Sequence, residues 1–128
     1  MLRASGSKAN VACFLSVTSW IPLSVYWKGE KRSQFSKKVS AVNGFNVNIS
    51  NAEGTHLSKQ LSDVAKALRR DATEFRRLKR LKLHAVVDFA VETKKDSGPV
   101  SWRVPAKFLA SFAKYGVDLE LSYYGDAP

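Results

Sequence analysis

Residues 57–82 read LSKQLSDVAKALRRDATEFRRLKRLK and carry the strongest periodic pattern in the chain. Apolar side chains recur in this segment at the spacing of about 3.6 residues that defines one face of an α-helix. Projected onto a helix, they form a single apolar stripe, which consists of Leu61, Val64, Ala65, Leu68, Ala72 and Phe75. The segment therefore predicts one long amphipathic helix that packs against the rest of the molecule.

The charged residues of this predicted helix are sorted by sign. Asp63, Asp71 and Glu74 fall on one flank of the apolar stripe. The other flank is basic, and at about 1.5 Å per residue it runs for roughly 30 Å, enough to follow several phosphates or the acidic rim of a protein. Arginine also favours bidentate contact with carboxylate or phosphate. The candidate partner-binding residues on this flank are Lys66, Arg69, Arg70, Arg76, Arg77 and Arg80.

A purely structural explanation of these charges stays open. Cations near the end of a helix stabilise its dipole, and Arg70 precedes Glu74 at the four-residue spacing of a helix-stabilising ion pair. Dipole compensation does not, however, explain why Arg69 and Arg70 stand in the middle of the helix. The basic flank is therefore the one feature of the sequence that indicates a partner.

Composition supports an anionic partner. The chain has 128 residues, 45% of them hydrophobic, and a formal net charge of +10. Residues 1–82 hold 16 Lys and Arg against 5 Asp and Glu, a net of +11, whereas residues 83–128 hold 5 against 6, a net of −1. Such asymmetry favours an anionic partner near the first two-thirds of the chain. A positive excess that serves solubility alone is the alternative.

Alternation of apolar and polar residues predicts strands on both sides of the long helix. The pattern is clearest after the helix, where Ala85, Val87 and Phe89 alternate with His84 and Asp88. Strands are expected over residues 11–18, 45–50, 83–92, 100–104 and 117–123.

The segments between these strands are predicted as turns, loops and short helices. Turn signals fall at residues 43–44 and 94–98. A short helix is expected over 105–116, with proline at its start and glycine at its end. A second short helix is expected over 19–27, followed by a charged loop over 30–43.

The predicted fold class is α+β. A mostly antiparallel sheet of about five strands would carry one long and one short helix packed on one face, because each strand has one apolar and one polar side. Residues 1–10 are small and polar and are expected to be flexible, so that residues 11–125 form a single domain. Trp20, Tyr26 and Trp27 are expected to complete the core beneath the sheet. If exposed, they would instead be interface anchors.

Few residues suit catalysis or metal binding. Cys13 alternates with apolar residues, which predicts a buried side chain in a strand. His56 and His84 are far apart, with no carboxylate at the spacing of a metal site. Asp88 and Glu120 could approach other acidic residues on neighbouring strands, but a polar open face is the simpler explanation. We therefore expect a protein that is not an enzyme, with no catalytic, cofactor-binding or metal-binding residue and no cofactor.

No segment predicts a membrane protein. The apolar stretch over 11–17 alternates with polar residues and lacks a signal-peptide cleavage site. No run approaches the roughly 20 apolar residues of a membrane span. We therefore expect a cytoplasmic protein without a membrane partner.

Three stretches carry a resemblance to a known family. They are the strand over 45–50 (FNVNIS), the helix opening over 56–61 (HLSKQL) and the ending over 108–124 (FLASFAKYGVDLELSYY). The order from Gly44 to Gly125 resembles the small bacterial proteins of domain of unknown function 4279. The resemblance implies a compact α+β fold without an assigned activity. Some members look like immunity-type proteins, which bind and block a toxin, but the resemblance assigns no functional residue.

Two functions fit these observations. The first is a non-enzymatic protein-binding module whose basic helix flank docks on an acidic protein. The alternative is a nucleic-acid-binding protein that contacts phosphates non-specifically through the same flank and the loop over 31–38. The predicted sheet does not favour stacked bases, because its outward residues include Asp88 and Glu120 and no aromatic side chain. The oligomeric state and the strand order are left open by the sequence.

Overall fold

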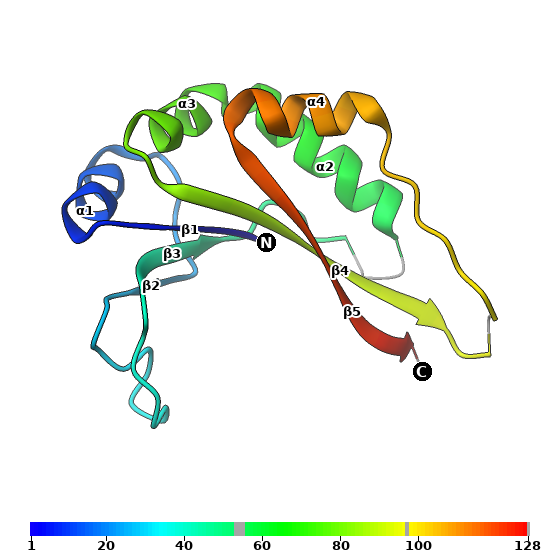
Figure 1. Ribbon diagram of the computed structural model, residues 1–128, viewed down its shortest axis with the longest axis horizontal. Coiled ribbons are helices and arrows are strands. Elements are labelled where there is room, and N and C mark those ends of the chain that lie inside the picture. Colours follow the sequence, from blue (N-terminus) through cyan, green and yellow to red (C-terminus); the bar gives the residue numbers. More distant parts are fainter. Residues whose placement is uncertain (53–55, 97, 128) are drawn as a thin grey trace.

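The computed structural model of the protein describes residues 1–52, 56–96 and 98–127. In these residues a five-stranded sheet carries four helices, all on one side (Figure 1). In chain order the elements are β1 (Leu2–Gly6), α1 (Lys8–Val17), β2 (Ser24–Tyr26), β3 (Asn43–Val47), α2 (Leu57–Arg70), α3 (Ala72–Arg80), β4 (His84–Lys94), α4 (Ala106–Tyr115) and β5 (Val117–Ala127). The α+β class and the helices on one face are confirmed, although the helices are more numerous than predicted.

The sheet is mixed, with the strand order β2-β3-β1-β4-β5. β1 pairs antiparallel with both β3 and β4, and β2 pairs antiparallel with β3. β4 and β5 are parallel, because α4 crosses over the helical side of the sheet between them. The expectation of a mostly antiparallel sheet holds for three of these pairings and fails for the fourth.

The strand at the N-terminus was missed by the sequence analysis. Residues 1–10 were expected to be flexible, but Leu2–Gly6 is the central strand, with Leu2 and Ala4 fully buried. The alternation of these two residues with Arg3 and Ser5 is only a few residues long. Small residues dominate the segment, so its period of two did not stand out.

The first predicted strand is a helix. Residues 11–18 alternate in polarity, yet α1 covers most of them. Ser7 caps the start of this helix, because its hydroxyl accepts a hydrogen bond from the backbone N–H of Asn10. Val11 and Phe14 are the buried residues of α1, at the three-residue spacing of one helix face. The alternating interpretation placed Phe14 on the polar side. It also predicted Cys13 as buried, whereas Cys13 is exposed.

The segment between α1 and β3 is extended. The predicted short helix over 19–27 is absent, and β2 occupies its last part. The expected turn at 43–44 is the start of β3, where Gly44 is needed because a Cβ atom would meet the ring of Tyr26 at 2.8 Å. Trp20 and Trp27 pack against the core as expected. Tyr26 is also buried, but it lies on the other side of the sheet, where its hydroxyl donates to Asn46.

The long predicted helix is two helices. The backbone leaves helical geometry at Asp71, which ends α2 and precedes α3. The backbone N–H groups of Glu74 and Phe75 then bond to the carbonyl of Asp71, which starts the new helix. The apolar stripe continues across this break, since Leu68 and Phe75 are both fully buried.

The last part of the chain departs from the prediction at one strand. Residues 100–104 have no regular structure and link β4 to α4, because β5 takes the place beside β4 that a hairpin strand would need. α4 ends at Gly116, whose φ of 64° is left-handed, as the glycine signal predicted.

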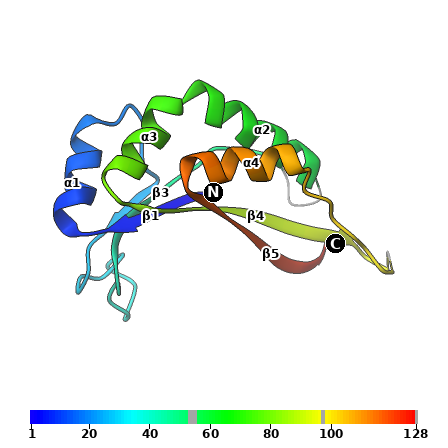
Figure 2. The same ribbon diagram turned by 45° about the horizontal axis from the view of Figure 1, so that its top comes forward.

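One core lies between the sheet and the helices. Aromatic rings connect its parts: Phe14 stacks on Phe45 with centroids 5.2 Å apart, and the rings of Trp20 and Phe75 form a T-shaped pair with centroids 5.2 Å apart. Phe89 of β4 contacts Phe112 of α4 at 6.2 Å. The opposite face of the sheet carries none of the four helices described above (Figure 2).

Candidate partner-binding surface

α2 is anchored to the sheet by its apolar face. Leu57, Leu61, Val64 and Leu68 are buried, at the three- and four-residue spacing that the sequence predicted. Gln60 is also buried, and its amide donates a 2.8 Å hydrogen bond to the carbonyl of Ala90 in β4. This fixed helix turns its basic residues toward solvent.

Glu74, predicted on the acidic flank, is a buried structural residue. Its carboxylate accepts hydrogen bonds from the Thr18 hydroxyl at 2.7 Å and from the Ser19 backbone and hydroxyl at 3.2 Å. The guanidinium of Arg77 donates to the same carboxylate at 3.1 Å. Burial pushes the pKa of Glu74 upward, but these donors outweigh it and hold the pKa below its usual value. Arg77 therefore serves the fold.

Arg70 also has an internal partner. Its guanidinium donates to the carboxylate of the adjacent Asp71 at 2.9 Å and 3.2 Å, where α2 ends. These hydrogen bonds lower the pKa of Asp71 and raise that of Arg70. The predicted pair of Arg70 with Glu74 is not formed, and Asp63 accepts a hydrogen bond from the Ser50 hydroxyl.

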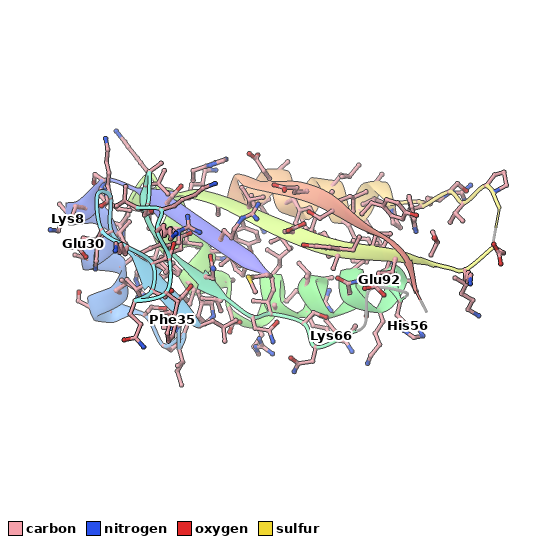
Figure 3. The ribbon with its side chains drawn as sticks, turned by 90° about the horizontal axis from the view of Figure 1, so that it is seen from below. Lys8, Glu30, Phe35, His56, Lys66 and Glu92 are labelled. Atoms are coloured by element: carbon pink, nitrogen blue, oxygen red, sulfur yellow. The ribbon has the colours of Figure 1, made fainter. Side chains whose placement is uncertain are left out.

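The other predicted cations stand alone on the helical surface. They are exposed and make no ion pair within residues 1–52, 56–96 and 98–127. Figure 3 shows Lys66 pointing away from α2 and from the body of the molecule. We refer to Lys66, Arg69, Arg76 and Arg80 as the free cations.

A groove of about 310 Å³ lies between α2 and α4. Arg69 stands on the α2 side and Lys107 on the α4 side, while Ala65 and Phe108 supply apolar surface. The sequence analysis missed Lys107 and Phe108, because nothing in the local pattern indicates that α4 lies beside α2. The groove combines two cations with an apolar wall, a combination that suits an acidic side chain with apolar neighbours.

A second groove, of about 470 Å³, lies on the other side of α2, against the segment 48–52. Lys59, Lys66 and Arg70 line it, together with Asp63. Its floor is polar and internally bonded, since Asn48 donates to Asn51 at 2.6 Å. The solvent-exposed side of α2 thus has a positively charged groove on each of its two flanks.

The open face of the sheet has the opposite character. Asp88 of β4 and Glu120 of β5 are direct neighbours, and Arg3 of β1 reaches both, at 3.6 Å and 2.7 Å. The Ser122 hydroxyl donates to Asp88 at 2.6 Å. Asp88 and Glu120 are therefore bridged by one cation from β1, a strand that the sequence analysis did not predict.

The loop between β2 and β3 lies on this open side. Both Figure 1 and Figure 2 show it below the sheet, away from the helices. Arg32 packs over the ring of Tyr26 at 4.2 Å, and Phe35 at the loop's tip points outward in Figure 3. The basic residues over 31–38 and the helix flank therefore do not form one continuous surface.

One of the two histidines lies beside a carboxylate. His84 Nε2 lies 2.7 Å from Asp118 Oδ2, with 63% and 67% of the side chains exposed. His56 lies apart from them, at the start of α2. In the described part of the chain, no three His, Cys, Asp or Glu residues are arranged to hold a metal ion. None of the helices described is long and apolar enough to cross a membrane.

Comparison with known proteins gives one match. The model of a family described as Domain of unknown function (DUF4279) matches residues 1–126. No curated protein and no solved structure matched the chain.

Proposed function

This chain belongs to the DUF4279 family, and we propose that it is a non-enzymatic protein-binding module that docks on an acidic partner through its helical face. The observation that carries the proposal is the set of free cations along α2 and α3. Every acidic residue of these two helices has an internal bond, whereas Lys66, Arg69 and Arg76 are exposed without an acidic partner among the described residues. Unpaired cations on one face attract and orient a negatively charged partner.

Helix stability accounts for only part of this set. Arg80 stands in the last turn of α3, where a cation offsets the helix dipole. Arg69 likewise stands in the last turn of α2, so the predicted mid-helix position of Arg69 is wrong, whereas Lys66 lies before that turn and Arg76 lies mid-way along α3. Lys66 and Arg69 each line one of the two grooves. Their positions suit contact with another molecule better than compensation of the helix itself.

A protein partner fits this surface better than nucleic acid. The groove between α2 and α4 has an apolar wall formed by Ala65 and Phe108, and protein interfaces combine an apolar centre with a polar rim. A nucleic acid bound to the helices would not reach the loop over 31–38 without passing around the edge of the sheet. An immunity-type role, in which the acidic partner is a toxin, is one form of the proposed function.

The non-enzymatic part of the proposal rests on the surroundings of the histidines. His84 and Asp118 are exposed on the open face, outside both grooves described above. Catalytic acids and bases are typically placed in clefts that shift their pKa values. An exposed pair on a polar sheet face is better explained as a surface ion pair.

The experiment compares two variants of equal charge. The first replaces the free cations Lys66, Arg69, Arg76 and Arg80 by Gln, and leaves Arg70 and Arg77 in place because they are bonded within the fold. The matched control replaces four cations of the β2–β3 loop by Gln: Lys28, Lys31, Lys37 and Lys38. Both variants and the unchanged protein are used to capture partners from an extract, with and without nuclease, and the captured protein is then purified and titrated.

The proposal predicts a purified acidic protein whose Kd rises at least about tenfold for the helix variant and stays nearly constant for the loop variant. Equal weakening by both variants would show attraction to net charge alone and would contradict the proposal. Capture that disappears after nuclease treatment would establish the nucleic-acid alternative.

A further inference from the structure

The two edges of the sheet are protected very differently. At one edge, β2 has three residues and is followed by the folded-back β2–β3 loop. At the other edge, β5 has 11 residues and contains no lysine, arginine or proline. Its outer side has no neighbouring strand within residues 1–52, 56–96 and 98–127. Proteins usually blunt such an edge, because its unpaired N–H and C=O groups accept further strands.

The helix above this edge has an apolar exposed side. α4 faces the core through Phe108 and Phe112 and faces α2 through Lys107 and Ser111. At about 100° per residue, the side opposite to α2 carries alanines and one leucine. These residues are Ala106, Leu109 and Ala113, and all are exposed. A surface helix normally turns charged or polar residues to solvent, so this side has the composition of a covered surface.

The sheet continues the same apolar surface below α4. Leu121 and Tyr123 point to the helical side of β5, yet 43% and 59% of their surface is exposed because α4 does not reach over them. Trp102 packs beside Tyr123, with ring centroids 6.3 Å apart, and is itself 40% exposed. We call the residues Leu109, Ala113, Leu121, Tyr123 and Trp102 the β5 border.

We propose that the β5 border binds a second copy of this chain, related by a two-fold axis perpendicular to the sheet. β5 would pair antiparallel with β5 of the second copy, and the two sheets would become one. α4 would lie beside the second α4, with their alanine-rich sides in contact. An extended peptide alone would pair with the edge of β5 but would leave the alanine-rich side of α4 exposed. A second copy of the chain would cover both the edge of β5 and this side of α4.

Charge selects one register for this pairing. β5 pairs with β4 without interruption from Val117 to Tyr123, and the pairing resumes at Asp126 after an irregularity. The uninterrupted part is the one considered for the new pairing. Pairing centred on Glu120 would place this acid opposite its own copy, and pairing centred on Leu119 would place Asp118 opposite Glu120. Pairing centred on Leu121 instead places Glu120 opposite Ser122 and Leu119 opposite Tyr123. In that register no acidic residue within 117–123 faces another.

Two measurements test the dimer. The first is the mass of the full chain by light scattering or sedimentation, over a wide range of concentration, for Leu109→Glu and Ala113→Glu. Ala12→Glu is the matched control, since Ala12 is an exposed helical alanine on α1, at the far end of the sheet. The second is oxidation of Leu121→Cys in a Cys13→Ser background, because residues facing each other across the axis are close enough for a disulfide.

The expected result is that the unchanged protein forms a dimer. Its dissociation constant should rise at least about tenfold in Leu109→Glu and Ala113→Glu, because each substitution buries an unpaired charge in the interface. The dissociation constant should be unchanged in Ala12→Glu. The Leu121→Cys variant should form a covalent dimer on oxidation. A monomer at every concentration, with no covalent dimer, would overturn the proposal. So would a dimer unaffected by both substitutions in α4, or capture of another protein's strand at β5 by an otherwise monomeric chain.

Discussion

On the open face of the sheet, charged residues from three strands are joined to one another, whereas on the helical face most cations make no ion pair with another described residue. Arg3 connects Asp88 with Glu120, and His84 meets Asp118. On the helices, the carboxylates are used within the fold by Thr18, Arg77 and their neighbours. The comparison separates charges that stabilise this protein from charges that remain available to a partner.

The largest effect is expected at Glu74, the buried acid of the helical face. Glu74→Ala removes the acceptor of Thr18, Ser19 and Arg77 and leaves a partly buried guanidinium unpaired. We expect a loss of about 3 kcal/mol in the free energy of unfolding, measured by urea denaturation. A loss no larger than that of an exposed substitution would show that this carboxylate does not hold α1 against α3.

Low pH should reduce the free energy of unfolding through the same residue, Glu74. Because the folded-state pKa of Glu74 lies below its unfolded value, its contribution is present above that unfolded value and is lost as the pH falls through the folded-state pKa. Asp71 behaves in the same way, through its hydrogen bonds from Arg70. In urea titrations from about pH 7 to about pH 3, the stability gap between the native protein and Glu74→Gln should therefore narrow. A constant gap would contradict this assignment.

A smaller effect is expected at the centre of the open face. Asp88→Ala deletes the contacts to Arg3 and to the Ser122 hydroxyl, but Arg3 keeps Glu120 at 2.7 Å. We expect a loss of about 1 kcal/mol in the free energy of unfolding. A loss equal to that of Glu74→Ala would mean that both faces depend equally on their charges.

The smallest effects are expected where charges are exposed. His84→Ala should change the free energy of unfolding by less than about 0.5 kcal/mol, because exposed ion pairs contribute little. Replacement of the four free cations by Gln should have a similarly small effect on thermal unfolding. Marked destabilisation by the latter variant would assign these cations to the fold and would remove the basis for a partner-binding role.

The long regular patterns of the sequence were sufficient for part of this fold. The apolar stripe through Leu61 and Leu68, and the alternation through Val87 and Phe89, both describe the structure correctly. These segments lie against one core over many residues, so their periods are sustained. Short elements gave no such signal, and the spacing of Val11 to Phe14 was hidden by a chance alternation.

The candidate surface was predictable as a basic flank but not in its details. The structural role of Arg77 follows from the hydrogen bonds around Glu74. Thr18 and Ser19 donate some of these bonds, although they lie more than fifty positions away from Glu74 in the chain. The groove beside Arg69 depends on Lys107 of α4. Contacts between distant segments leave no trace in a local pattern, which is why the sequence alone did not separate bonded cations from free ones.

The position of β1 has a consequence for how the chain folds during synthesis. β1 precedes every other described strand, yet it lies between β3 and β4, with Leu2 opposite Val47 on one side and Val87 on the other. While the ribosome is still producing α2 and α3, β1 can have at most one of its two partners. The sheet can close around β1 only after β4 has emerged, and such long-range pairings form slowly. Until then Leu2 and Ala4 have no partner strand on their β4 side.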